Sequence, residues 1–252
     1  MIIERLKLVR CIVDPMAERN YSISPYTYCK GNPIKFIDPT GMLEEVYING
    51  PESDAATKEL QKSTSMTLTR DDKSGKISAT GEAKTDADKK LSEAINSTSI
   101  KVEVTATDKT STSAGKLFVG GAFMGNTVTK TENGTTVVAK QEVNPSVLGA
   151  ISDGNGKPGA DMRHEVTEAY QGALISQSTG ISSPGSNQAG SVWSQAHAVA
   201  TPQSGNIYQE TIDVFKNPTN NNSYVCGANW YVLGANNSKR VVQNFYRFPK
   251  LK

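Results

Sequence analysis

Three residues in one short run have the types and spacing that chemistry at a metal ion requires: His164, Glu165 and Glu168. If the run from 161 to 170 is helical, His164 and Glu168 lie one turn apart on the same side and can hold one ion. Glu165 is displaced sideways by one residue, close enough to act on the metal's water without ligating the metal. This is the geometry of an H-E-x-x-H motif with a glutamate as second ligand, and it predicts a metal-binding helix.

The metal site needs a third ligand from elsewhere in the chain. A catalytic divalent metal usually takes three protein ligands and keeps one position open for water. The sequence contains two histidines in all, His164 and His197. His197 is therefore the candidate for the third ligand.

Further residues are candidates for supporting roles at this site. Tyr208 and Tyr170 are candidates for stabilising an oxyanion beside the metal. Glu210 and Asp213 are replacement ligands in case Glu168 points away from the ion. Only the distances in the folded chain decide between these roles.

The same run also has a structural interpretation. At helical spacing its apolar residues fall on one face, which would be buried. An exposed amphipathic helix with a solvated, glutamate-rich face would show the same local pattern. The apolar face consists of Met162, Val166, Ala169, Tyr170, Ala173 and Leu174.

Composition predicts a soluble, folded chain that does not bind nucleic acid through charge. Hydrophobic residues make up 37% of the 252 residues and aromatic residues 7%, while Gly, Ser, Thr and Asn are frequent, which favours β-strands joined by many turns. The net charge is +2, from 27 basic and 25 acidic side chains, and no basic block is interleaved with aromatic residues. A metal-dependent nuclease is disfavoured for this reason.

Targeting and cysteine signals are weak. No stretch reaches the roughly 18 to 20 apolar residues that a membrane span needs, and charges interrupt the apolar run of residues 1–10, so we expect neither a span nor a secretory signal peptide.

The three cysteines are widely spaced and form no C-x-x-C pair, which excludes a disulfide scaffold and a thiolate zinc knuckle; they are Cys11, Cys29 and Cys226. Cys226 is most simply a buried small apolar residue.

The order of predicted elements favours an α+β fold. A short strand at 44–51 precedes a hairpin over 65–81. Residues 144–159 and 181–190 are rich in turn formers and are expected to be loops, the first leading directly into the metal-binding helix. The remaining expected elements are a helix at 86–96, a strand at 99–107, a glycine-rich strand at 117–123, a hairpin of 126–131 with 135–143, a helix at 193–200 and strands at 223–233 and 240–248.

The first forty-two residues differ in character from the rest because turn signals are dense in them. These signals are Asp14-Pro15, Ser24-Pro25-Tyr26, Asn32-Pro33 and Asp38-Pro39-Thr40-Gly41-Met42. Over about residues 11–42, two Asp-Pro motifs around N-P-x-x-x-x-D-P-x-G resemble the end of the Rhs-repeat-associated core of bacterial polymorphic toxins. The resemblance implies a core fragment at 1–42 followed by a toxin domain at 43–252.

This resemblance carries further expectations. In that family the core ends a β-rich shell around a variable toxin, and paired aspartates are implicated in self-cleavage after the core. The corresponding residues here are Asp14 and Asp38, with cleavage after Met42. The resemblance also implies a secreted effector of a bacterium, delivered outside the cell by a dedicated secretion system, and a cognate immunity protein as partner.

The second part of the chain resembles the zincin metallopeptidases in element order and in its His164-Glu165-x-x-Glu168 run. In zincins a helix packs beside a mixed sheet whose edge strand holds the substrate. The resemblance implies a Zn²⁺ peptidase acting on a protein or peptide, although Fe²⁺ or Mn²⁺ also suits a site of two histidines and one glutamate. Glu165 would then take a proton from water and return it to the leaving amine.

The alternative is a non-catalytic effector or binding module with a structural metal or none. Four protein ligands close a structural zinc site, whereas a catalytic site keeps one position open. The number of protein ligands therefore discriminates between the two functions.

Overall fold

The computed structural model describes residues 45–132, 134–216 and 223–246. The segment that resembles an Rhs core lies outside these residues. Asp14, Asp38 and the expected cleavage after Met42 therefore lie outside the described residues as well.

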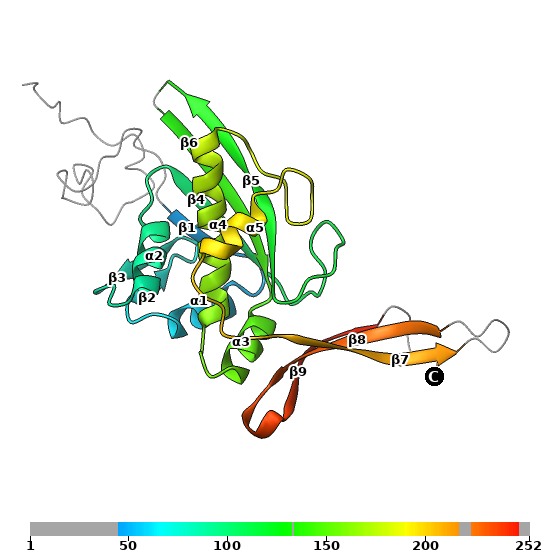
Figure 1. Ribbon diagram of the computed structural model, residues 1–252. Helices are drawn as coiled ribbons and strands as arrows, with labels where there is room; N and C mark the ends of the chain where they lie inside the picture. Colours follow the sequence, from blue (N-terminus) through cyan, green and yellow to red (C-terminus); the bar gives the residue numbers. More distant parts are fainter. Residues whose placement is uncertain (1–44, 133, 217–222, 247–252) are drawn as a thin grey trace, which may run out of the picture.

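A four-stranded mixed sheet forms the centre of the molecule (Figure 1). The strand order is β1-β4-β6-β5, with β1, β4 and β6 parallel and the edge strand β5 antiparallel to β6. Side chains alternate across a strand, so the apolar residues of β4 at every second position face the core. The bounds are β1 Glu45–Asn49, β4 Ile100–Ala106, β5 Gly121–Thr131 and β6 Gly134–Val143.

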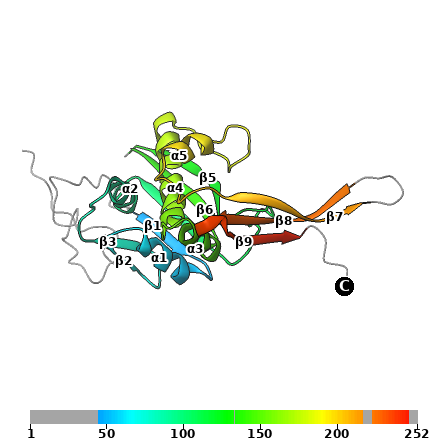
Figure 2. The same cartoon turned by 60° about the horizontal axis from the view of Figure 1, so that its bottom comes forward.

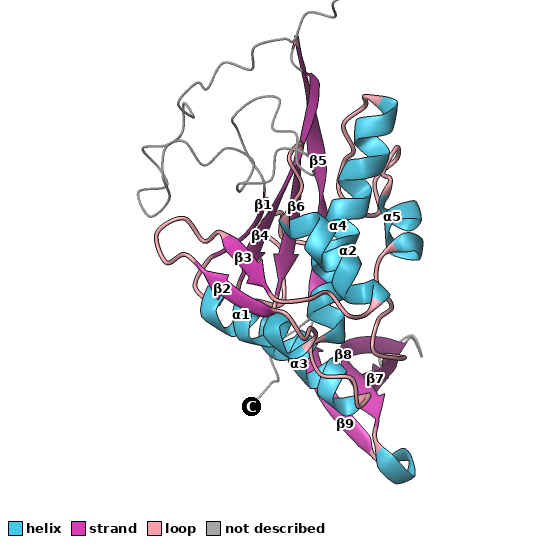
Figure 3. Ribbon diagram, turned by 90° about the vertical axis from the view of Figure 1, so that its left-hand side faces the viewer, coloured by secondary structure: helices cyan, strands magenta, loops and turns pink. Residues whose placement is uncertain are grey.

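The longest helix, α4 (Ala160–Thr179), packs against this sheet and is covered by other helices (Figure 3). It begins after Gly159 and ends before Gly180, two glycines in the left-handed conformation, with φ 76° and 68°. Helices α1, α2, α3 and α5 all contact α4. No helix within the described ranges is long and apolar enough to cross a membrane. The covering helices are α1 Ser53–Lys62, α2 Asp86–Ile95, α3 Pro145–Gly154 and α5 Trp193–Val199.

Helix α4 is buried on its polar side as well as its apolar side. Its apolar face joins the main hydrophobic core through Met162, Val166 and Ala169. Glu165 and Glu168 are only 7% and 2% exposed. The interpretation of this helix as an exposed one with a solvated, glutamate-rich face is therefore wrong.

Two smaller antiparallel sheets complete the fold. The hairpin β2 (Thr67–Arg70) and β3 (Ile77–Thr80) lies beside β1. The other sheet has the order β7-β8-β9 and extends away from the body (Figure 2). It is anchored where Val232 of β8 packs against α3. Its bounds are β7 Tyr208–Lys216, β8 Ser223–Leu233 and β9 Lys239–Tyr246.

The observed elements confirm the α+β class and correct part of the expected order. The expectation that 144–159 is a loop is wrong, because α3 occupies most of it. The Asn144 side chain accepts a hydrogen bond from the backbone N–H of Val147 (3.2 Å), and Pro145 stands in the first turn, so the Asn-Pro pair starts a helix instead of a turn. Helix α1 and strand β7 were not expected. The expected strand at 117–123 and the expected hairpin arm at 126–131 are parts of one strand, β5, which begins at Gly121.

Candidate metal centre

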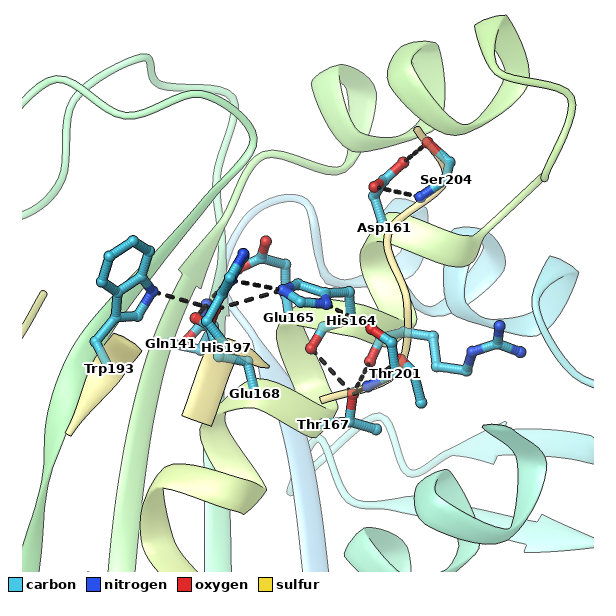
Figure 4. A network of polar contacts seen from close by, with 11 residues as sticks. Gln141, Asp161, His164, Glu165, Thr167, Glu168, Trp193, His197, Thr201 and Ser204 are labelled. Atoms are coloured by element: carbon cyan, nitrogen blue, oxygen red, sulfur yellow. Dashed lines mark hydrogen bonds and ion pairs between the residues drawn. The ribbon is translucent and has the colours of Figure 1, made fainter. Parts of the chain in front are cut away.

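His164, Glu168 and His197 converge on one point between α4 and α5 (Figure 4). Their ligand atoms all lie within 4.8 Å of one another. His197 Nδ1 is 2.6 Å from Glu168 Oε2 and 3.0 Å from His164 Nε2, and His164 Nε2 is 3.4 Å from Glu168 Oε2. The predicted meeting of these three residues is confirmed.

The tautomer of His164 follows from its hydrogen bond on the far side of the ring. His164 Nδ1 lies 2.6 Å from the carbonyl oxygen of Thr201. A carbonyl oxygen only accepts, so Nδ1 carries a hydrogen, and in the neutral ring the lone pair is on Nε2, which faces Glu168 and His197. This is the orientation that a metal-binding histidine requires.

The segment that supplies this carbonyl is fastened to α4. The backbone N–H of Thr201 donates to Thr167 Oγ1 (3.1 Å), and the two threonine hydroxyls are 2.9 Å apart. Further along, the Asp161 carboxylate accepts from the backbone N–H (3.1 Å) and the hydroxyl of Ser204, and also from the hydroxyl of Ser152 (2.7 Å). All five side chains are buried, so the position of the His164 ring is set by the fold.

Both carboxylate oxygens of Glu168 accept hydrogen bonds from neighbouring side chains. The Trp193 indole Nε1 donates to Oε2 at 3.1 Å, the same oxygen that faces the two histidines. Gln141 Nε2 lies 3.4 Å from Oε1. Trp193 and His197 stand one turn apart on α5 with ring centroids 5.2 Å from each other, so one helix supplies both a ligand and a donor to another ligand.

Glu165 stands beside the cluster and is not part of it. Its carboxylate accepts a hydrogen bond from Gln141, and its other close neighbour is Gly121, where a β-carbon would overlap the carboxyl group. Burial, together with the charge of Glu168, raises the pKa of Glu165 to about 8. A carboxylate with a raised proton affinity next to a ligand cluster is suited to the role of a general base.

Glu165, Glu168, His197 and Trp193 line a pocket with a volume of about 320 Å³. Its other walls are the turn of residues 112–119, the start of β5 at 121–124 and the loop at 185–188. This loop is fixed to β5, because Ser186 N–H donates to the Phe123 carbonyl oxygen at 2.9 Å. This volume is at the lower end of the range for ligand-binding pockets, and Glu168 and His197 of the cluster are part of the lining.

The charges around the cluster favour a cation. Glu165 and Glu168 are buried one turn apart, and within the described parts of the chain no lysine or arginine pairs with either. Burial opposes the charged form of His164, but its hydrogen bond to Glu168 and the charge of Glu165 outweigh this and raise its pKa. Buried carboxylates are stable when they are paired or bind a metal, so the centre attracts positive charge.

The remaining candidate residues lie elsewhere. Tyr170 is buried in the main core, and burial together with the charge of Glu93 raises its pKa. Tyr208 stacks on Tyr231 with ring centroids 5.6 Å apart. Neither Tyr170 nor Tyr208 lines the pocket, so the structure gives no support to their roles as oxyanion stabilisers. Glu210 binds Lys239 on the outer sheet and is not needed as a replacement ligand.

The sequence-based prediction did not include Gln141, Trp193 and Thr201. A signal for Gln141 exists in β6, where positions 137, 139 and 143 are apolar and a glutamine occupies the core-facing position between them. Trp193 precedes His197 by four residues, the spacing of one helical turn. Thr201 acts through its backbone and hydroxyl, and no pattern in the sequence marks it.

Comparison of the chain with protein-family models, curated proteins and solved structures finds no match. The geometry of the centre is therefore the observation from which its function has to be inferred.

Proposed function

We propose that the protein is a metal-dependent hydrolase, a zinc metallopeptidase that acts on a protein or peptide. The observation that carries this proposal is the convergence of His164, Glu168 and His197, the last two lining a pocket, with the buried Glu165 beside them. A solvent-exposed acidic helix would not need such an arrangement, because its carboxylates would be solvated by water.

The residues present fit a zinc ion. His164 Nε2, His197 Nδ1 and Glu168 Oε2 would hold it, and two histidines with one glutamate are a known catalytic ligand set. When bound, such an ion lowers the pKa of a water molecule and polarises a carbonyl oxygen. Three protein ligands, where a structural zinc takes four, support catalysis over a structural role in this part of the chain.

The protein's own residues would then complete the reaction. Glu165 faces the pocket and accepts the proton of the attacking water, which it returns to the leaving amine. Its burial favours the protonated form and so makes the carboxylate a stronger base. Trp193 and Thr201 keep Glu168 and His164 in place while the substrate is attacked.

The sheet supports a peptide substrate and a zincin-like arrangement. Helix α4 packs beside a mixed sheet, and β5 is its antiparallel edge strand. The first residues of β5, from Gly121 to Met124, line the pocket. An extended peptide can lie along such an edge, with its backbone close to the proposed base.

The Rhs-like segment supports a biological role as the toxin part of a bacterial polymorphic toxin. In this proposal residues 43–252 are the toxin domain, a secretion system delivers it, and an immunity protein protects the producing cell. Expression of the chain in bacteria without such a partner should slow growth, and Glu165→Gln should relieve the effect. Equal growth inhibition by wild type and Glu165→Gln would count against a catalytic toxin.

Peptidase activity is tested directly on a proteome-derived peptide mixture with the zinc-loaded full chain. We expect new peptide termini that appear with wild type and are absent with Glu165→Gln and after chelation. Wild type that binds zinc and produces no new termini would favour the binding module instead.

A further inference from the structure

Gln141, which is not one of the proposed metal ligands, contacts both Glu165, the proposed base, and Glu168, a proposed ligand. Gln141 lies on β6 and is 1% exposed. Its amide nitrogen donates to Glu165 Oε2 and lies 3.4 Å from Glu168 Oε1 (Figure 4). The two hydrogens of one amide group are thus directed at the proposed base and at one proposed ligand.

The orientation of this amide is determined by its neighbours. Gln141 Oε1 is buried and has no hydrogen-bond partner in the described part of the molecule. When both carboxyl groups are ionised, a turned amide would point that oxygen at two further acceptors. The amide therefore donates to both carboxylates and leaves its own oxygen without a donor, which is an unfavourable arrangement for stability alone.

The backbone of Gln141 is held between two neighbouring strands. It pairs with Phe123 of β5 on one side and with Val104 of β4 on the other. The core-facing residues of β6 at 137, 139 and 143 are apolar, and an apolar side chain at 141 would continue that pattern. A glutamine at this position places a donor at a fixed point opposite α4.

We propose that Gln141 is a positioning residue that keeps the two carboxylates in separate roles. This inference rests on the proposed metallopeptidase function. By holding Glu168 Oε1, Gln141 leaves only Oε2 for the metal, so that Glu168 binds through one oxygen and a coordination position stays open. By holding Glu165 Oε2, it keeps the base turned toward the pocket and off the metal.

The test is Gln141→Met, which keeps the length of the side chain and removes both donors. We expect zinc affinity to fall about tenfold to a hundredfold and kcat to fall as well. The melting temperature of the metal-free protein should fall less than in a variant that only removes hydrogen bonds, because the lost donors to two buried carboxyl groups are partly offset by removal of the buried unpaired oxygen. Gln141→Leu serves as a second variant, since it fits the apolar pattern of β6.

Gln177→Met is the matched control. Gln177 lies on α4, and its amide nitrogen also donates two hydrogen bonds, to Ser99 Oγ at 2.9 Å and to the Thr135 carbonyl oxygen at 2.8 Å. It contacts no residue of the centre. Its loss should lower the melting temperature and leave zinc affinity and kcat unchanged.

Cobalt in place of zinc gives a readout that a purely structural role would not change. The visible absorption of Co²⁺ reports its coordination number, and two-oxygen binding by Glu168 in Gln141→Met should weaken and shift these bands relative to wild type. An unchanged cobalt spectrum with wild-type zinc affinity and kcat would overturn the role of Gln141 and leave the proposed function intact. If wild type binds metal without cleaving peptides, the proposed peptidase fails and the spectrum still decides whether Gln141 positions Glu168. If the wild-type protein binds neither zinc nor cobalt, both the proposed function and the role of Gln141 are overturned.

Discussion

His164 Nδ1 lies 2.6 Å from the carbonyl oxygen of Thr201, a residue that follows α5 and is fastened to α4 by Thr167. This contact fixes which nitrogen of His164 faces the centre. The orientation of the His164 ring thus depends on a residue that follows it by 37 positions in the sequence.

Thr167→Val should loosen this segment. The variant removes the hydroxyl that accepts from Thr201 N–H and contacts the Thr201 hydroxyl, and it leaves a buried N–H unpaired, at a cost of about 1–3 kcal/mol in the free energy of unfolding. We expect zinc affinity to fall about tenfold, measured by competition with a chelating dye. Thr179→Val, at the exposed end of α4, is the control and should bind zinc like wild type. Unchanged affinity in Thr167→Val would show that Thr201 does not orient the ligand.

The variants Glu165→Gln and Glu168→Gln should lose different properties, the first turnover and the second metal binding. Glu165→Gln should keep the metal and lose turnover by about a hundredfold or more, the usual size of a general-base contribution. Glu168→Gln should weaken metal binding, because a neutral amide replaces an anionic ligand. Metal content and turnover measured on both variants check this. Wild-type turnover in Glu165→Gln would remove the catalytic role of Glu165.

The raised pKa of Glu165 predicts how the stability of the metal-free protein depends on pH. The pKa is about 8 in the folded chain against an ordinary value of 4.5, so between these values the folded state binds more protons than the unfolded state. The free energy of unfolding therefore falls as pH rises from about 4.5 to about 8. His164, whose pKa is also raised, contributes a fall of the same sign.

The contribution of Glu165 is isolated by comparing wild type with Glu165→Gln. We expect the variant to show a weaker fall in stability over this range and to be the more stable protein at pH 8, measured by urea unfolding in the presence of a chelator. If the free energy of unfolding changes with pH equally in the two proteins, the pKa of Glu165 is not raised.

Gly121→Ala should displace the proposed base without touching a ligand. A β-carbon at this position would overlap the Glu165 carboxyl group, which then has to move. We expect turnover to fall by at least about tenfold while zinc affinity stays near that of wild type, in line with the sensitivity of catalysis to small displacements. Gly234→Ala, where the nearest atom is the Ser238 hydroxyl oxygen at 3.1 Å, is the control. Wild-type turnover in Gly121→Ala would place the base elsewhere.

The local part of the site was predictable from the sequence, because a spacing of four residues fixes where two side chains stand on a helix. His197 could be assigned only because the chain has one other histidine. Gln141 was missed, because its contacts with Glu165 and Glu168 are visible only when the position of α4 opposite β6 is known. The burial of Glu165 was equally out of reach, because the elements that cover it come from distant parts of the chain.

The fold was predictable where patterns are strong and short. Strand β4 and helix α2 were expected almost at their observed bounds, the first from its alternation and the second from its acidic first turn. Helix α3 was missed because Gly149, Gly154 and Pro145 read as turn formers, although the Asn144 cap and the apolar residues behind it support a helix. Strand β7 was missed although five of its nine residues are of strand-favouring types, because these residues do not alternate regularly with polar ones.

Zinc content is the most direct test of the central claim that His164, Glu168 and His197 form one metal site. The full chain is loaded with zinc, passed through a desalting column, and its metal is counted by elemental analysis in wild type, His197→Ala and the control Gln177→Met. The account predicts about one zinc per chain in wild type and in Gln177→Met and little in His197→Ala, since a site of three protein ligands loses one of them. Wild type without zinc, or His197→Ala with as much zinc as wild type, would contradict it.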